Sequence, residues 1–445
     1  MGRLFGTDGI RGVANTELTP ELVVGLGRAL VRTLREEGSD RPQILAGRDP
    51  RASGEMLEAA LVAGVTSAGG DIVSAGVLPT PGVAFLTAET SAHAGAMISA
   101  SHNPVEDNGI KFFGPGGIKL TDDEELRIEQ LLEHAADAPP VGAHIGRLRR
   151  DNELLVRYVD HLAAAATENL AHLHVVLDCA NGAASNVAPF VLRRLGAQVD
   201  VLNAKPDGTN INAGCGSTHA EVVARAVVEA GADLGLAHDG DADRLIAADH
   251  GGNIVDGDVI LAILAADRQE RVGLDTVVTT VMTNLGFTHA MRELGINVIQ
   301  TKVGDRYVRE AMLAGGHPLG GEQSGHIILT DYATTGDGVL TAIRLLSVLA
   351  RTGRSLADLA TIMQRLPQVL VNVSGVDRDR LPEAQAVWKT VEQETEMLAD
   401  HGRILVRASG TEPVVRVMVE ADTEQRALEV AERLAKVVNE ELSLS

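Results

Sequence analysis

The stretch Gly69-Gly70-Asp71-Ile72-Val73 turns the chain from a helical segment into a short strand, and this order indicates the fold class. A glycine and a few small or polar residues come first, and β-branched residues then favour an extended backbone. The same order recurs at residues 196–199, which lead into Val201-Leu202, and at residues 295–299. A repeated helix–turn–strand unit predicts α/β layers, whose loops at strand ends commonly bind ligands.

The length of the chain predicts several domains. At 445 residues it exceeds the size of one ordinary hydrophobic core. From Gln368 onward the pattern changes to a strand, a helix from about Pro382, two strands and a helix capped near Asp422; the strands span 404–407 and 414–419. We therefore expect a small α+β domain at the end of the chain. The predicted domains are residues 1–150, 151–252, 253–366 and 367–445.

Composition excludes several classes of protein. Aromatic residues make up 2% of the chain and the formal net charge is -22, so nucleic acid is an unfavourable partner. No apolar stretch reaches the roughly 20 residues of a membrane-spanning helix. Cys179 and Cys215 are far apart in sequence, which disfavours a disulfide framework or a zinc knuckle and favours a reducing cytoplasm. The negative charge also means that any phosphate site must be built locally.

Three carboxylates alternate in Asp239-Gly240-Asp241-Ala242-Asp243-Arg244, directly after the apolar run 234–237. Such a loop can direct oxygen ligands at a hard cation, and Mg²⁺ suits phosphoryl transfer. An EF-hand is excluded because its sixth position, which requires Gly, is Arg244, and its twelfth, which requires Glu, is His250. The alternative is a solvated acidic turn.

A hydroxyl is presented after another apolar run, in Ser99-Ala100-Ser101-His102-Asn103-Pro104. Serine can carry a phosphoryl group if nearby cations neutralise the developing charge, and Lys111 could supply part of that charge. The alternative is a serine that caps a turn, which is the commoner role of an isolated serine. The other loops of the chain must decide between the two.

Two further loops have binding chemistry. Residues 407–413, with Arg416 beyond them, combine two guanidiniums, two hydroxyls and a glycine backbone, which suits phosphate better than a plain polar hairpin does. Residues 320–326 offer the Glu322 carboxylate and the Ser324 hydroxyl to sugar hydroxyls, while His326 alone is more often structural. Residues 5–12 and 47–51 add weaker, Gly-rich loops with Arg. The P-loop, dinucleotide, nucleophile-elbow and zincin motifs are absent from the sequence.

In this combination and order, the loops resemble those of the α-D-phosphohexomutase superfamily over essentially the whole chain, from Phe5 to Arg416. The resemblance implies its heart-shaped architecture: three similar mixed-sheet α/β domains plus a C-terminal α+β domain, each contributing one functional loop to a deep cleft. The segments that most resemble the subgroup acting on amino sugars are 5–12, 210–212, 216–219, 303–306 and 320–326.

The resemblance also implies residue roles. Ser101 corresponds to the phosphoserine, and Ser101, Asp239, Asp241 and Asp243 correspond to the metal ligands. The implied reaction-centre residues are Arg11, His102, Lys111, Arg244 and His326, without a choice of general acid or base. The implied sugar and distal-phosphate residues are Glu322, Ser324, Arg407, Ser409, Gly410, Thr411 and Arg416. Ser99 stands where many relatives have Thr, a change that keeps the hydroxyl.

The implied activity is interconversion of glucosamine 6-phosphate and glucosamine 1-phosphate through a phosphoserine and a bisphosphate, supplying UDP-N-acetylglucosamine and cell-wall synthesis. The implied cofactors are Mg²⁺ and an activator that phosphorylates the enzyme, either glucosamine 1,6-bisphosphate or glucose 1,6-bisphosphate. The expected partner is a small phosphosugar, not nucleic acid or a membrane, and the expected location is the cytoplasm. A homodimer is one option, because the sequence leaves the oligomeric state open.

Three alternatives remain at this stage. A phosphomannomutase or phosphoglucomutase would share every loop except for detail around residues 322–326. A metal-dependent phosphatase using Ser101 would release inorganic phosphate. A non-catalytic binding protein would be unaffected by Ser101→Ala. Neither of the last two accounts for the phosphate loop around Arg407.

Overall fold

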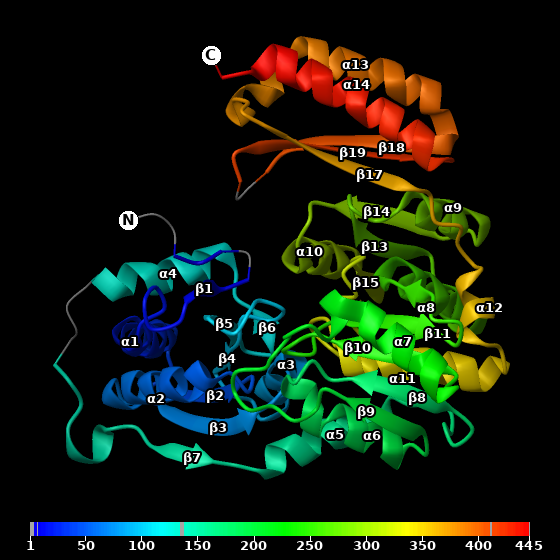
Figure 1. The fold of residues 1–445 in the computed structure, drawn as a ribbon. Coiled ribbons are helices and arrows are strands. Elements are labelled where there is room, and N and C mark those ends of the chain that lie inside the picture. Colours follow the sequence, from blue (N-terminus) through cyan, green and yellow to red (C-terminus); the bar gives the residue numbers. More distant parts are fainter. Residues whose placement is uncertain (1–3, 7, 134–137, 410–411, 445) are drawn as a thin grey trace. The chain divides into compact units, whose positions relative to one another are not determined.

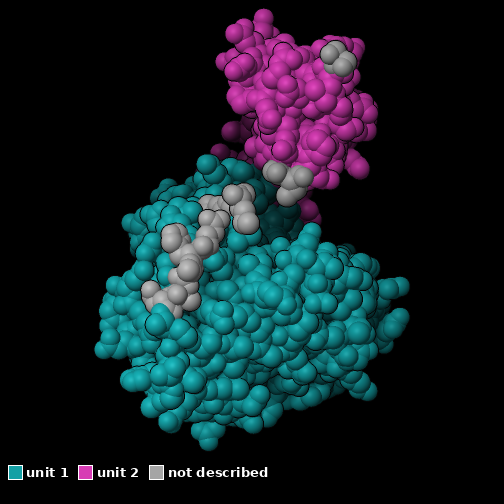
Figure 2. Space-filling view, turned by 90° about the vertical axis from the view of Figure 1, so that its left-hand side faces the viewer, with its two compact units in different colours: residues 1–282, 296–362 teal, residues 283–295, 363–445 magenta. Residues whose placement is uncertain are grey.

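The computed structural model describes residues 4–6, 8–133, 138–409 and 412–444. The chain forms two compact units, which are coloured separately in Figure 2. Unit 1 contains residues 1–282 and 296–362, and unit 2 contains residues 283–295 and 363–445. Each unit has its own sheets and its own apolar core.

The first sheet of unit 1 has seven strands, in the order β1-β5-β4-β2-β3-β7 with β6 beside β5. β2 is parallel to β3 and β4, whereas β5 is antiparallel to β4 and β1. The strands are β1 (Ile10–Val13), β2 (Gln43–Arg48), β3 (Asp71–Val77), β4 (Ala94–Ile98), β5 (Asp107–Gly114), β6 (Ile118–Lys119) and β7 (Leu148–Arg150). The helices are α1 (Pro20–Glu36), α2 (Ala52–Ser67), α3 (Thr80–Glu89) and α4 (Asp122–Glu133), with a 3₁₀ turn η1 (Gly142–His144).

Different helices cover the two faces of this sheet (Figure 1). Alternate residues of β2, such as Ile44 and Ala46, join one core cluster with side chains of α1, α2 and α4. The other face meets α3, because a Cβ on Gly47 would lie 2.5 Å from Val83 Cγ2 and one on Gly95 would lie 2.2 Å from Thr87 Oγ1. Glycine in β2 and β4 thus lets α3 approach the sheet closely.

The other two sheets of unit 1 are also mixed. Their strand orders are β12-β11-β10-β8-β9 and β14-β13-β15-β16. The strands are β8 (His174–Asp178), β9 (Gln198–Leu202), β10 (Leu234–His238), β11 (Leu245–Asp249), β12 (Ile254–Val255), β13 (Thr276–Thr280), β14 (Asn297–Thr301), β15 (Leu319–Gly321) and β16 (Ile327–Leu329). The helices are α5 (Glu153–Ala164), α6 (Ala188–Arg194), α7 (Ala220–Ala230), α8 (Gly257–Val272), α10 (Asp305–Gly315), α11 (Gly338–Thr352) and α12 (Leu356–Ala360), with 3₁₀ turns η2 (Ala183–Asn186) and η3 (Ser217–His219).

One feature is common to these three sheets. A strand that has a parallel neighbour is followed in the chain by its own antiparallel partner: β4 by β5, β10 by β11, and β15 by β16. The loops at these reversals are residues 99–106, 239–244 and 322–326. They are the loops in which the sequence predicts chemistry, and the predicted mixed α/β sheets are confirmed.

Unit 2 contains the predicted small α+β fold. Its sheet has the order β17-β19-β18. Its elements are α9 (Leu285–Glu293), β17 (Gln368–Ser374), η4 (Arg378–Glu383), α13 (Gln385–Leu398), η5 (Ala399–His401), β18 (Gly402–Ala408), β19 (Val414–Ala421) and α14 (Glu424–Leu442). The predicted helix start at Pro382 is three residues early, because Pro382 lies in the 3₁₀ turn η4. The cap of α14 is Thr423, whose side chain accepts from Arg426 N, one residue after the predicted Asp422.

Among the described residues, no helix combines the length and the apolar character needed to cross a membrane.

Candidate active site

Ser101 lies in the loop that joins β4 to β5, and its backbone φ is 52°. This left-handed conformation is unfavourable for a residue other than glycine, so neighbouring groups must hold it. The Ser99 hydroxyl donates to Asp49 Oδ2 at 2.6 Å and accepts from Ser101 N at 2.9 Å. The buried Ser101 hydroxyl donates to Asp239 Oδ2 at 2.5 Å. The serine that the sequence selects therefore faces the aspartate loop.

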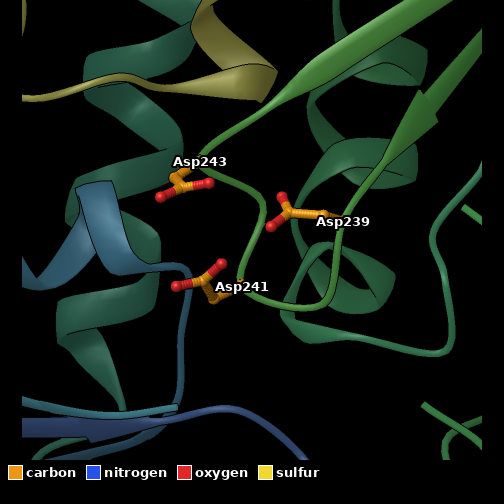
Figure 3. Close-up of side chains that lie close together, drawn as sticks. All are labelled: Asp239, Asp241 and Asp243. Atoms are coloured by element: carbon orange, nitrogen blue, oxygen red, sulfur yellow. The ribbon is translucent and has the colours of Figure 1, made fainter. Parts of the chain in front are cut away.

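The aspartate loop connects β10 to β11, and its three carboxylates point toward one another (Figure 3). Asp239, Asp241 and Asp243 are all buried, and each offers one oxygen within 4.8 Å of the others. Gly240 has no room for a side chain, because a Cβ there would lie 2.5 Å from the Ser101 carbonyl oxygen. The aspartate loop is thus packed directly against the serine loop. A solvated acidic turn is excluded by this burial.

The donor set fits a divalent cation. Asp241 Oδ1 and Asp243 Oδ1 are buried without a hydrogen-bond partner among the described residues. A buried carboxylate oxygen without a partner is costly, and a hard cation with oxygen ligands removes that cost. Carboxylate oxygens alone, without Cys or His, favour Mg²⁺ over softer metal ions. The residues present therefore suit the metal that the sequence predicts.

Basic side chains surround this cluster. Lys111 on β5 donates to Asp241 Oδ2 at 3.2 Å, and Thr80 at the start of α3 donates to the same oxygen at 2.5 Å. Arg244 Nε lies 3.7 Å from Asp243 Oδ1, and His326 Nδ1 lies 3.4 Å from Asp243 Oδ2.

The other predicted residues of the reaction centre contact the serine loop. His102 Nδ1 is 3.4 Å from Ser101 Oγ, and Arg11 Nη1 donates to Asn103 Oδ1 at 3.5 Å.

Burial and neighbouring charges shift the protonation of these groups. Burial raises the pKa of Asp239 well above its usual range, and the charges of Asp243 and Asp241 raise it further. Burial opposes the charge on Lys111, but the carboxylates of Asp241 and Asp243 outweigh burial and raise the pKa of Lys111. Burial, with Arg244 and Arg11, lowers the pKa of His102 to about 4, so its imidazole is neutral at pH 7.

His326 is subject to two opposing effects. Burial would lower its pKa, but the charge and hydrogen bond of Asp243, with the charges of Asp305 and Glu322, together outweigh burial and raise it to about 9. The Gly336 N–H, however, donates to His326 Nε2 at 3.0 Å, and an accepting nitrogen has no proton. In this arrangement Nε2 is unprotonated, and the proton on Nδ1 faces Asp243.

A cavity of about 370 Å³ in unit 1 brings several predicted residues together. Its lining residues are Asp8, Arg11, Asp243, Arg244, Thr280, Met282, Val303, Gly304, Asp305, Glu322, Gln323, Ser324 and His326. Glu322 accepts from Gly304 N at 3.1 Å, and burial raises the pKa of its carboxyl. Ser324 Oγ is buried and has no partner among the described residues, so it is available to a ligand. Acidic and basic side chains both line the cavity.

Comparison with known proteins assigns the chain to a family. Models of the phosphoglucomutase/phosphomannomutase alpha/beta/alpha domains I, II and III match residues 2–138, 156–252 and 256–366, and the C-terminal domain model matches residues 370–437. A phosphoglucosamine mutase of Thermobifida fusca (strain YX) is 54% identical over 449 residues, covering 100% of both chains. One from Acidothermus cellulolyticus is 56% identical over 445 residues, covering 99% of this chain and 96% of the relative. The chain belongs to the phosphoglucosamine mutase family.

Solved structures agree on the fold of this phosphoglucosamine mutase family member. A phosphoglucomutase/phosphomannomutase family protein of Burkholderia thailandensis superposes with a TM-score of 0.85 at 24% identity, covering 99% of each chain. The N-acetylphosphoglucosamine mutase of Aspergillus fumigatus, solved with GlcNAc-6P and magnesium, has a TM-score of 0.68 at 18% identity, covering 98% of this chain and 95% of its own. The predicted superfamily and its four-domain α/β architecture are confirmed.

In unit 2 of this phosphoglucosamine mutase family member, the predicted phosphate residues lie at one end of the β18–β19 hairpin. Arg407 and Arg416 are directly paired across the strands. Burial and the charge of Arg416 lower the pKa of Arg407, because two neighbouring cations disfavour each other's charge. Ser409 Oγ accepts from Glu412 N at 3.2 Å. The predicted Gly410 and Thr411 lie outside the described residues.

Sequence reasoning assigned no role to several residues at these sites. Arg378 Nη1 donates to the carbonyl oxygens of Ser409 and Glu412, at 2.5 and 2.7 Å, and so supports the backbone of the phosphate loop. Arg51 and Asn212 both donate hydrogen bonds to the carbonyl oxygen of Ser101 in the serine loop. Both lie in segments that the sequence singles out, but without a role. Asp305 lines the cavity and pairs with Lys119 at 3.1 Å. For Arg51, Asn212 and Asp305, the only signal in the sequence is that each lies in a segment already singled out there.

Proposed function

We propose that this enzyme interconverts glucosamine 6-phosphate and glucosamine 1-phosphate, with Ser101 carrying the phosphoryl group. The observation that carries the proposal is the Ser101 hydroxyl, placed 2.5 Å from Asp239 Oδ2 in a buried cluster of three aspartates. The Ser101 hydroxyl thus lies beside buried carboxylate oxygens of Asp241 and Asp243 that have no hydrogen-bond partner among the described residues. Full-length identity to phosphoglucosamine mutases supports the choice of substrate.

In the proposed reaction, phospho-Ser101 gives its phosphoryl group to the free hydroxyl at carbon 1 of glucosamine 6-phosphate. The bond from phosphorus to Ser101 Oγ breaks, a bond to the sugar oxygen forms, and the hydroxyl proton passes to Ser101 Oγ. The resulting 1,6-bisphosphate reorients in the site and transfers its 6-phosphoryl group to Ser101. Glucosamine 1-phosphate is then released, and it supplies UDP-N-acetylglucosamine synthesis.

We propose that Ser101, Asp239, Asp241 and Asp243 hold Mg²⁺. A bound Mg²⁺ would neutralise charge on the transferring phosphoryl group, which is the main requirement of such transfers. The unpaired oxygens of Asp241 and Asp243 support this assignment. Initial phosphorylation of Ser101 would come from glucosamine 1,6-bisphosphate or glucose 1,6-bisphosphate.

The remaining residues bind, orient and neutralise. Lys111 and Arg244 place positive charge beside Asp241 and Asp243, and Arg11 places it beside Asn103 in the serine loop, around the position proposed for the phosphoryl group. The neutral His102 imidazole and His326 are the candidates for moving the hydroxyl proton. Glu322 and Ser324 face the cavity and would bind sugar hydroxyls, while Arg407, Ser409, Gly410, Thr411 and Arg416 would bind the distal phosphate.

We further propose a cytoplasmic location, since sugar phosphates are charged and do not leave the cell freely. The same proposal assigns residues 1–150, 151–252, 253–366 and 367–445 to four domains.

The test is phosphorus NMR on purified, phosphorylated protein with Mg²⁺ and either glucosamine 6-phosphate or glucose 6-phosphate. We expect much faster formation of the 1-phosphate from the amino sugar. A preference for glucose would transfer the protein to the neighbouring mutases, and release of inorganic phosphate alone would make it a phosphatase. Ser101→Ala should abolish turnover without changing the circular dichroism spectrum; full activity in this variant would refute the mechanism.

A further inference from the structure

Two side chains from separate segments hold the backbone around the reactive serine. Arg51 Nη2 donates to the carbonyl oxygens of Ser101 and Asn103, both at 2.9 Å. Asn212 Nδ2 donates to the same two oxygens, at 2.9 and 3.1 Å. Four hydrogen bonds therefore converge on the two carbonyl groups on either side of His102.

These bonds act on the residue whose conformation most needs support. The φ of Ser101 is 52°, and a serine keeps a left-handed backbone only where its surroundings impose it. Its amide group is fixed through the Ser99 hydroxyl, and its carbonyl group is fixed by Arg51 and Asn212. The direction of the Ser101 side chain follows from the orientation of these two peptide groups.

Asn212 also lies against the aspartate loop. A Cβ added to Gly240 would be 2.5 Å from the Ser101 carbonyl oxygen and 3.0 Å from Asn212 Nδ2. The Asn212 amide therefore occupies the point at which the serine loop meets the aspartate loop. Asn212 is itself buried and left-handed, with a φ of 56°, and its backbone N–H donates to the Ala180 carbonyl at 2.9 Å.

Neither Asn212 nor Arg51 is among the residues that line the cavity. Arg51 is fully buried and pairs with the equally buried Asp49 at 2.9 Å, so its removal would leave an unpaired charge in the core. Asn212 is neutral, and its side-chain nitrogen donates its hydrogen bonds to the serine loop. It can therefore be changed without exposing a buried charge.

We propose that Asn212 is a positioning residue that sets the phosphoryl-carrying Ser101 against the aspartate loop. The inference rests on the proposed function only in that Ser101 carries the phosphoryl group. Asn212 does not line the cavity; it acts through the carbonyl groups of Ser101 and Asn103. Its loss should therefore slow phosphoryl transfer and leave substrate binding unchanged.

The first variant is Asn212→Gly, which keeps the left-handed backbone and removes the side chain that donates to the serine loop. Because each lost hydrogen bond is worth about a fivefold factor, we expect kcat to fall about 30-fold while KM stays within about twofold. Transfer from preformed phospho-Ser101 in a single turnover, measured by rapid quench, should fall by the same factor. Asn212→Asp keeps the shape but cannot donate, and its charge would face two carbonyl oxygens, so its kcat should fall further.

The matched control is Asn203→Gly. Asn203 is also left-handed, with a φ of 47°, and its Nδ2 donates to Asp178 Oδ2 at 3.0 Å, away from the serine loop. We expect this variant to lose thermal stability while keeping the wild-type kcat of its folded fraction. A purely structural role for Asn212 would make the two variants behave alike.

The proposal is overturned if Asn212→Gly keeps wild-type kcat, if its KM rises while kcat does not fall, or if its loss of activity equals its loss of folded protein. These outcomes are distinct from failure of the proposed function. If the wild-type protein converts no glucosamine 6-phosphate, the reaction is wrong; if it converts the sugar and the variant is unaltered, only the positioning role is wrong.

Discussion

The Tyr158 hydroxyl donates to Asp337 Oδ2 at 2.7 Å, and both side chains are buried. Asp337 also caps α11 by accepting from Leu340 N at 2.9 Å, and the first residue of that helix, Gly338, donates its N–H to the carbonyl of Ala242 in the aspartate loop at 3.0 Å. The Tyr158 hydroxyl thus supports the site from a distance. We predict that Tyr158→Phe destabilises unit 1, and that the loss depends on pH.

The sign follows from the pKa of Asp337. Burial raises it from 3.8 to about 6, so the folded protein holds this proton more tightly than the unfolded chain does. The stability that Asp337 contributes is therefore lost as the pH rises from 3.8 to about 6. Above that range the carboxylate is ionised, and the ionised form is the one that needs the hydrogen bond from the Tyr158 hydroxyl. A hydrogen bond to a buried charge is worth about 2 kcal/mol, so Tyr158→Phe should cost about that much at pH 8 and under half of it at pH 5.

The assay is scanning calorimetry of the wild type and Tyr158→Phe at both pH values. A cost of about 2 kcal/mol lowers Tm by about 4 °C, and the difference between the two proteins should shrink at pH 5. Tyr332→Phe is the matched control, because Tyr332 is half-buried and its hydroxyl makes no hydrogen bond that the structure records within the described residues. Equal losses at both pH values would show that packing, not the charge of Asp337, is responsible, and the reasoning would fail.

Three other changes test the site directly. Gly240→Ala would place a methyl group 2.5 Å from the Ser101 carbonyl oxygen, so we expect more than a tenfold loss of kcat and weaker Mg²⁺ binding by calorimetric titration. Lys111→Met removes a cation 3.2 Å from Asp241, and kcat should fall about 100-fold with the fold retained; a fall below threefold would remove Lys111 from the mechanism. Arg407→Ala should raise KM about tenfold and leave Mg²⁺ affinity unchanged, and a changed metal affinity would contradict its assignment to the distal phosphate.

The sequence could predict features that depend on local order. The reversal from an apolar strand to alternating carboxylates at 239–243 is visible in the sequence alone, and so is the serine after β4. Element ends were less accurate, because Pro382 suits the first turn of an α-helix and a 3₁₀ turn equally well. The order of elements is thus predictable where each residue's preference is decided by its neighbours in the chain.

The supporting residues could not be predicted because their partners are remote in sequence. Asn212 bonds to Ser101 across 111 positions, and Thr80 reaches Asp241 across 161. Asn212 lies in a segment that the sequence singles out, but nothing in the immediate surroundings of either residue indicates which remote group it contacts. Their roles follow from the way in which the sheets pack, which no local pattern contains.

Each functional loop of unit 1 contains one left-handed residue: Ser101, Ala242 and Gly325, with φ of 52°, 58° and 90°. The carbonyl group of each accepts a hydrogen bond from another segment of the chain. The donors are Arg51 and Asn212 for Ser101, the Gly338 N–H for Ala242, and the Leu245 N–H for Gly325.

In all three loops the reversal of the chain includes such a residue, and the left-handed conformation is costly for a residue with a side chain. Because the stabilising donor comes from a different segment each time, no loop can hold its geometry alone. The Ser101 hydroxyl also donates to Asp239 in the aspartate loop, and the Leu245 N–H directly after that loop donates to Gly325 in the sugar loop, so a substitution in one loop should alter the chemistry of the next. This interdependence explains why a loop motif read in isolation is weak evidence for catalysis, whereas the same motifs found together and in order identify the site.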